Sequence, residues 1–333
     1  MVDFRYHVVS IVAVFLALGI GIVFGTTAIN RAILDDLDRN VHRLTDEKHD
    51  LEAQRKQLTA EADAAEAWGK ALYPSLVGGT LAGQRVVVVS APGASRTVRD
   101  EVVKQLAAAG ATVTGRIRLN DALTDPARAA ELDDLVVREL PQGLTVPATG
   151  ATAARRAMTE LAYVVSLAAG DTSAVVAPSP APLPSAPLAT TRVLAAFRER
   201  GFVGLDGDTV LPAPAVVVVL PGAPPSATPS PTATGAPPRA VAVELVAALA
   251  ALPARPAVVA VAPTGGSVAG TELEDVRADS PVKDLVSSVD DVDTVFGQAA
   301  LVLAIDAARH GRTGHYGYGV GAEGPVPTAA PPS

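Results

Sequence analysis

The side chains in this sequence best suited to chemistry are its histidines, of which there are five. Two of them, His310 and His315, lie close together near the C-terminal end, whereas the other three fall in or beside N-terminal helical segments. A site for a soft transition metal needs Cys, Met or several His, and the chain has no Cys and one internal methionine, Met158. His310 and His315 are therefore the candidate metal ligands, and no fuller set of ligands is visible.

The segment Gly265-Gly266-Ser267-Val268-Ala269 resembles a turn that presents a nucleophilic serine, except that Ala269 stands where such a turn has glycine. A serine hydrolase would also need a histidine, and only the two C-terminal ones could serve. The absence of Cys excludes a cysteine nucleophile. We therefore expect no catalytic residues and no enzymatic activity.

Two further segments near the C-terminus carry polar or aromatic groups. Asp290, Asp291 and Asp293 form an acidic cluster whose spacing does not match a calcium-binding loop, and Asp293 or Thr294 is well placed to cap a following helix. The segment 314–319, GHYGYG, sets two aromatic residues between glycines. We interpret the first as a helix cap and the second as a terminus docked onto its domain.

The loop from Ser90 to Ser95 follows a β-branched run and precedes a helical pattern, which is where parallel sheets bind anions. It lacks the Gly-Lys-Ser/Thr ending of a P-loop and the three glycines of a dinucleotide-binding turn. A ligand site and a plain Gly/Pro turn are both open here, and the turn is the simpler interpretation. No cofactor motif is evident in the chain.

The elements that would position these residues follow from composition and hydropathy. The chain has 333 residues and a formal net charge of −8, with no clustered Lys and Arg, so nucleic acid is not expected as a partner. An uncharged run from Val8 to Ile29 exceeds the about 20 residues needed to cross a bilayer and has no polar face. It is also longer than the core of a cleaved signal peptide. We predict a short cytoplasmic N-terminus over 1–7 and a transmembrane signal anchor over 8–29.

Small residues lie along one side of this anchor. Gly21 and Gly25 are four residues apart, a spacing that favours close helix–helix packing, although glycine is also common in membrane helices in general. Counting Lys and Arg on the two sides of the anchor does not favour a cytoplasmic N-terminus. A long domain is translocated regardless of nearby charge, however, and Pro/Ser/Thr-rich linkers are typical of extracytoplasmic segments. We expect the body of the protein to lie outside the cytoplasmic membrane.

Residues 30–70 carry a heptad repeat with leucine at the d positions and charged residues elsewhere. Leucine at d favours a parallel pair of helices, and Lys48 and Arg55 at a positions disfavour larger bundles. We predict a coiled-coil homodimer, with one long helix lying on its own globular domain as the alternative. The predicted dimer interface consists of Gly21, Gly25, Leu37, Val41, Leu44, Leu51 and Leu58.

Residues 83–320 predict a doubly wound, mostly parallel α/β domain. The β-branched runs at 84–90, 112–119, 215–220 and 257–262 alternate with helical patterns, as in β-loop-α-β units with right-handed crossovers. Two subdomains are the alternative. The Pro-rich stretches 177–187 and 221–238 predict disordered loops, and residues 321–333 predict a disordered tail.

The N-terminal stretch DFRYHVVSIVAVFLALGIGIVFG, the heptads, GQRVVVVSAPG, and SSVDDVDTVFGQAALVLAI with the later GHYGYG together resemble the actinobacterial copper transport (MctB-like) family. The resemblance runs from Asp3 to about Gly319 and implies a cell-envelope protein of copper homeostasis, described in the family as an outer-membrane channel or efflux component. Copper is implied by this resemblance alone. The sequence lacks the many alternating segments of a transmembrane barrel, and its anchor lacks the polar residues that line a pore.

Two functions of different classes follow. In the first, the protein supports copper efflux or homeostasis. In the second, it is a dimeric envelope scaffold, without enzymatic activity, that recruits partners at the cell wall or division site. Its expected partners are a second copy of itself, the membrane and other envelope proteins.

Overall fold

The computed structural model describes residues 4–142, 144–147, 151–166, 186–207, 209–223, 240–268 and 270–328. The chain divides into two compact units, Met1–Ala65 and Glu66–Ser333, and each is described by itself. The Pro-rich stretches expected to be loops fall mostly outside the described residues, except that α5 already begins at Ala186.

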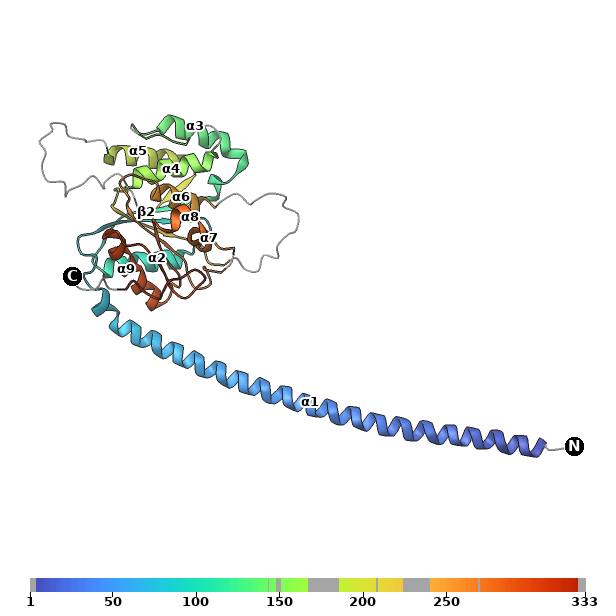
Figure 1. Ribbon diagram of the computed structural model, residues 1–333. Helices are drawn as coiled ribbons and strands as arrows, with labels where there is room; N and C mark the ends of the chain where they lie inside the picture. The colour runs from blue at the N-terminus through green and yellow to red at the C-terminus, as the bar shows by residue number, and fades with distance from the viewer. Residues whose placement is uncertain are drawn as a thin grey trace, which may run out of the picture. The chain divides into compact units, whose positions relative to one another are not determined.

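The first unit belongs to a single helix, α1, which runs from Phe4 to Val77 and continues into the second unit (Figure 1). Its segment Tyr6–Phe24 has a mean hydropathy of 2.6 and is long and apolar enough to cross a membrane. The predicted anchor and the predicted stalk are therefore parts of one uninterrupted helix. Association of two such helices stays a prediction.

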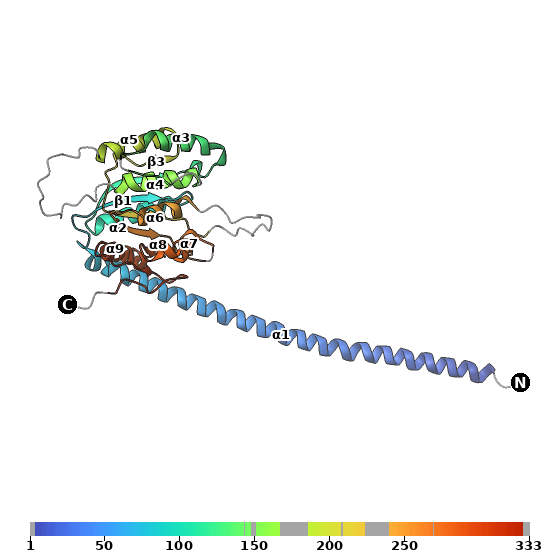
Figure 2. The same ribbon diagram turned by 45° about the horizontal axis from the view of Figure 1, so that its top comes forward.

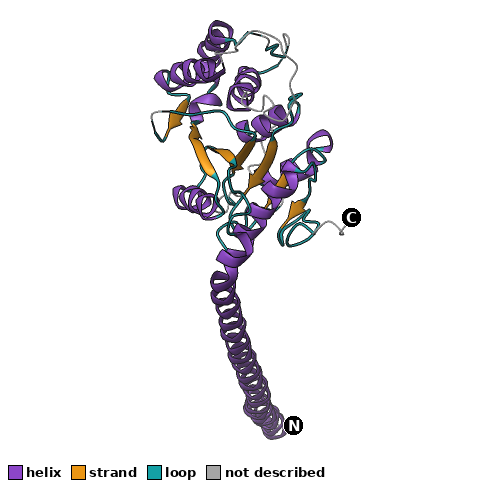
Figure 3. Cartoon of the chain, turned by 90° about the vertical axis from the view of Figure 1, so that its left-hand side faces the viewer, coloured by secondary structure: helices purple, strands orange, loops and turns teal. Residues whose placement is uncertain are grey.

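The second unit is built on one seven-stranded sheet with the order β3-β2-β1-β4-β5-β6-β7. Figure 3 draws the strands of this sheet in orange, with helices around them. All neighbouring strands are parallel except the edge strand β3, which runs antiparallel to β2. The strands are β1 Arg85–Ser90, β2 Thr112–Leu119, β3 Val203–Leu205, β4 Ala215–Val219, β5 Ala257–Val261, β6 Ser287–Val289 and β7 His315–Tyr316.

Helices cover both faces of this sheet (Figure 2). The sequence runs AVVVV and AVVAV of β4 and β5 are buried throughout, as expected for central strands with helices on either side. The helices of the second unit after α1 are α2 Arg96–Ala108, α3 Ala129–Glu139, α4 Ala153–Ser166, α5 Ala186–Glu199, α6 Val241–Ala250, α7 Glu272–Ala278, α8 Ser280–Lys283 and α9 Val295–Arg309, with the short 3-10 turns η1 Asp121–Leu123 and η2 Pro126–Arg128.

Alternate residues of β1 divide the core into two layers. Val87 and Val89 pack with α3, α4, α5 and α6, whereas Val86 and Val88 pack with α2 and α9. Figure 1 shows α3, α4 and α5 on one side of the sheet and α2 and α9 on the other. The predicted mostly parallel α/β class is confirmed; a doubly wound topology in the strict sense remains a prediction.

The last turns of α1 belong to the globular unit, so the body begins at Glu66 and not at the predicted residue 83. Tyr73 and Val77 are buried in the layer that contains α2 and α9. The helix passes through Pro74 and ends at Val77, where Gly78 donates its backbone N–H to the Pro74 carbonyl at 3.0 Å. The sequence placed the boundary later because the heptad pattern and Pro74 suggested that the helix ends before the domain begins.

Candidate functional site

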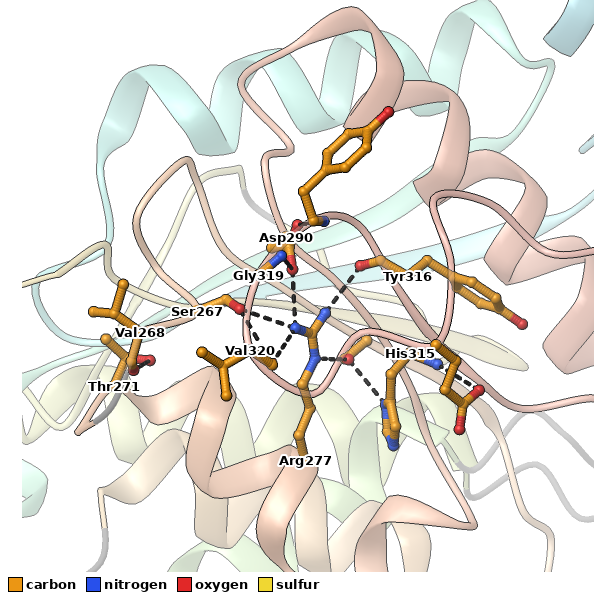
Figure 4. A network of polar contacts seen from close by, with 12 residues as sticks. Ser267, Val268, Thr271, Arg277, Asp290, His315, Tyr316, Gly319 and Val320 are labelled. Atoms are coloured by element: carbon orange, nitrogen blue, oxygen red, sulfur yellow. Dashed lines mark hydrogen bonds and ion pairs between the residues drawn. The ribbon is translucent and has the colours of Figure 1, made fainter.

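The described residue with the densest set of polar contacts is Arg277 on α7, at the carboxyl edge of strands β5, β6 and β7 (Figure 4). Its side chain is only 3% exposed. The guanidinium donates hydrogen bonds to Ser288 Oγ (2.8 Å), Ser267 Oγ (2.9 Å), Asp290 Oδ2 (2.9 Å), Val320 O (2.8 Å) and Tyr316 O (2.9 Å). We call these residues the Arg277 network.

Asp290, directly after β6, is the charge partner of Arg277. Its carboxylate also accepts the backbone N–H groups of Tyr318 at 2.8 Å and Gly319 at 3.0 Å. Burial alone would raise the pKa of Asp290, but hydrogen bonds from Asp291, the Tyr318 amide and Arg277 outweigh it, so the pKa lies below its usual value. Asp290 therefore stays ionised and binds the C-terminal segment to the sheet.

The glycines of the segment GHYGYG are explained by this contact. Gly317 has a φ of +123°, and a Cβ there would collide with the Asp290 carboxylate. A Cβ at Gly319 would collide with Ser267 Oγ. The predicted docking of this segment onto the domain is thus observed. Residues up to Gly324 take part in it, since Gly317 N–H donates to the Gly324 carbonyl at 2.9 Å, so the ordered chain extends past the expected start of the tail at 321.

Asp291 and Asp293 behave differently from Asp290. The Asp293 carboxylate accepts hydrogen bonds from the backbone N–H of Thr264 at 2.7 Å and from the Thr264 hydroxyl at 2.9 Å. The N-cap of α9 is instead Thr294, whose hydroxyl accepts a hydrogen bond from the Gly297 N–H. Burial, followed by the neighbouring Asp290, raises the pKa of Asp291 to about 6. Of the two predicted caps, the structure selects Thr294.

Ser267 belongs to the Arg277 network and His315 contacts that network through Ser288, but Ser267 and His315 do not form a nucleophile–base pair. The Ser267 hydroxyl bonds to Arg277 and to the Val320 carbonyl, at 3.4 Å. His315, on β7, bonds through Nδ1 to Ser288 Oγ at 2.9 Å, and burial lowers its pKa. The geometry is that of a buried structural network, in which each hydroxyl already has a charged or backbone partner.

His310, the other candidate ligand, caps the C-terminus of α9 with its side chain 60% exposed. Its Nδ1–H donates to the Asp306 carbonyl at 2.7 Å, which leaves Nε2 as the unprotonated nitrogen of the neutral ring. The structure thus gives the two histidines different surroundings, one exposed and one buried. Within the described residues there is no group of three or more His, Asp or Glu that could hold a metal ion.

The residues of the predicted dimer interface lie on α1. Leu37, Val41, Leu44, Leu51 and Leu58 are 51% to 65% exposed, which is unusual for residues of this size and leaves an uncovered apolar stripe. Gly21 has no other atom within 4 Å of where a Cβ would lie, and the surroundings of Gly25 are outside the described residues.

Sequence reasoning missed Arg277 and Ser288. The segment ELEDVRA that contains Arg277 reads as a short, exposed acidic helix, and nothing in it distinguishes a buried arginine. The three glycines of GHYGYG were the available signal, because glycine marks positions where the backbone packs closely against another group.

Comparison with known proteins extends over nearly the whole chain. Residues 1–327 match the family described as "Copper transport outer membrane protein, MctB". The protein named copper transporter MctB from Mycobacterium tuberculosis (strain ATCC 25618 / H37Rv) is 30% identical over 329 residues, covering 97% of this chain and 98% of the relative. That of Mycobacterium leprae (strain TN) is 28% identical over 336 residues, with the same coverage. The chain therefore belongs to the MctB family of copper transport proteins.

Proposed function

We propose that this protein acts in copper efflux and homeostasis as a membrane-anchored component of the cell envelope. The observation that carries the proposal is similarity to proteins named copper transporter over 97% of the chain, from the apolar helix to the C-terminal segment. Because that similarity includes both units, the anchor and the α/β body belong to the function together. In this proposal the body lies outside the cytoplasmic membrane, as the Pro-rich stretches also favour.

The residues available for copper transport limit the role that this protein could have in efflux. One apolar helix without charged residues offers no polar lining for an ion path, so we place this chain as an accessory or binding component of efflux. Copper, as cargo, would bind imidazole nitrogens, since the chain has no Cys. His310 fits best, because its Nδ1–H is held by the Asp306 carbonyl, the usual second contact of a metal-binding histidine.

The histidine assignment is tested with the purified full-length protein in detergent. The variant His310→Ala with His315→Ala is expected to bind copper about tenfold or more weakly, because loss of a ligand or its support costs at least that much. His42→Ala, on α1, is the matched control. Affinity unchanged in the double variant would reject both residues as ligands.

A second candidate function, a dimeric envelope scaffold, is favoured by the exposed apolar stripe on α1. Five large apolar residues at heptad positions remain more than half exposed in the single chain, and a second parallel helix would cover them. The two functions are compatible if the dimer is the form that supports copper efflux. Measuring dimerisation and copper tolerance in the same variants distinguishes the two functions.

A further inference from the structure

A cavity of about 290 Å³ lies at the carboxyl edge of β1 and β2, on the other side of β4 from the Arg277 network. Its wall is formed by the loop 90–94, by Arg99 of α2 and by residues 118–121 at the end of β2. Parallel α/β sheets bind their ligands at this edge, next to the N-terminus of the following helix. The position and the lining residues of this cavity are therefore those of a candidate ligand-binding site.

Two guanidinium groups line the cavity, and one of them is deeply buried. Arg99 is 5% exposed, and its Nη2 lies 3.3 Å from Asp206 Oδ2; the Nε of Arg118 lies 3.3 Å from Asp206 Oδ1. A single carboxylate thus holds the two guanidiniums side by side. The exposed Asp100 adds a further ion pair to Arg99 at 3.5 Å.

Within the part of the chain that the structure describes, these ion pairs leave one N–H group of each arginine without a hydrogen bond. Among the described residues, neither the Nε–H of Arg99 nor that of Arg118 has a hydrogen-bond acceptor. A buried guanidinium is costly unless its N–H groups are hydrogen-bonded, and each guanidinium has five of them. The two Nε atoms are themselves buried, but both arginines line the cavity and the Arg118 side chain is 41% exposed, so an acceptor group in the cavity can reach the Arg118 side chain.

The absence of a side chain at Gly204 leaves room for the guanidinium of Arg118. Gly204 on β3 lies against its guanidinium, and a Cβ at this position would approach Arg118 Nη2 to 2.7 Å. A larger residue would push the guanidinium out of its place beside Asp206. The position of Arg118 thus depends on a glycine on the neighbouring edge strand.

The start of α2 has an electrostatic pattern opposite to the usual one. The side chain of its N-cap residue, Ser95, makes no capping hydrogen bond, and the first turn has no acidic residue but carries Arg96 and Arg99. Helix N-termini normally attract acidic side chains because their free N–H groups point outward. Here an anion in the cavity would supply the missing negative charge.

We propose that this cavity binds the phosphoryl group of a small ligand, either inorganic phosphate or a phosphomonoester. The two guanidiniums and the N-terminus of α2 suit a doubly charged oxyanion. Asp121, exposed at the rim, disfavours a second phosphate group, so the ligand is a monophosphate. The site is independent of copper binding.

The test uses the full-length protein in a non-ionic detergent, titrated calorimetrically with inorganic phosphate, with glycerol phosphate and with acetate at matched ionic strength. Saturable binding of phosphate is expected, together with slower amide exchange in residues 91–99. Tighter binding of glycerol phosphate than of phosphate identifies a phosphomonoester; equal binding identifies free phosphate.

Arg118→Gln and Arg99→Gln are each expected to weaken binding about tenfold or more, since each removes charge-assisted hydrogen bonds. Arg138→Gln, an exposed arginine on α3, is the matched control and should bind as the wild type does. If Arg99→Gln does not fold, Arg118→Gln decides, because that side chain is 41% exposed. Absence of phosphate binding by the wild type, equal binding by Arg118→Gln, or equal affinity for acetate would overturn the proposal.

Discussion

Arg277 Nη1 and Asp290 Oδ2 lie 2.9 Å apart with both side chains almost completely buried, 3% and 1% exposed. This ion pair links α7 to the end of β6, and through the Tyr318 and Gly319 amides it also holds the C-terminal segment. Chain segments that are distant in sequence thus depend on one charge pair. The network closes the β7 edge of the domain.

Replacing Arg277 with Met should strongly destabilise the globular unit. The substitution leaves the Asp290 carboxylate buried without its cation, which typically costs about 3–5 kcal/mol. Urea unfolding of the full-length protein in detergent, followed by circular dichroism, measures the loss. Arg138→Met on the exposed side of α3 should change the free energy of unfolding by less than about 0.5 kcal/mol. Equal stability of the two variants would show that the network is not structural.

Because Glu160 on α4 is buried, we expect the free energy of unfolding to fall as the pH rises. Its side chain is fully buried, and within the described residues neither carboxylate oxygen has a hydrogen-bond partner. Burial, followed by the nearby Glu139, raises its pKa from 4.5 to about 8. The folded state therefore holds a proton that the unfolded state releases, so this contribution is complete below about pH 4.5 and is lost as the pH rises through about 8.

The measurement is the free energy of unfolding between pH 7 and 8, where Glu160 should contribute a slope of up to about 1.4 kcal/mol per pH unit. Glu272, whose pKa burial raises to about 7, adds a smaller slope that is about half of the full value at pH 7 and fades towards pH 8. Glu160→Gln should flatten the curve, whereas Glu199→Gln, an exposed residue on α5, should leave it unchanged. A steep curve that persists in Glu160→Gln would contradict the assignment.

The apolar stripe of α1 predicts a dimer that depends on its leucines. Leu44→Glu combined with Leu51→Glu places charges in the interface and should abolish covalent dimers after cross-linking in membranes. Ala53→Glu with Ala60→Glu introduces the same charges at exposed heptad positions outside the stripe and should preserve the dimer. A wild type that cross-links only as a monomer, or a leucine variant that still dimerises, would refute the coiled coil.

Much of the fold was predictable from local patterns. The β-branched runs located β1, β2, β4 and β5 to within about one residue, because buried parallel strands have a distinctive composition. The helical patterns expected after Ser95 and after the Asp293/Thr294 cap likewise correspond to α2 and α9. The short strands β3, β6 and β7 were missed, since two or three residues carry no periodicity.

The polar networks were far less accessible to sequence reasoning. His315 and the acidic cluster were singled out, but their contact with Arg277 depends on the order of strands in the sheet and on the turn after β7. The Arg99–Asp206–Arg118 arrangement was missed for the same reason, because Asp206 reaches the arginines only through the antiparallel edge strand β3. Long-range charge pairing requires the fold to be known first.

The measurement that tests the copper assignment most directly is the copper content of cells grown in raised copper, determined by mass spectrometry. It compares the parent strain, a strain lacking this gene, and that strain carrying the full-length gene. A role in copper efflux predicts excess copper in the deletion strain and its return to the parental level on complementation. Equal copper in all three strains, above all with altered cell shape or division in the deletion strain, would contradict that role and leave the envelope scaffold as the function.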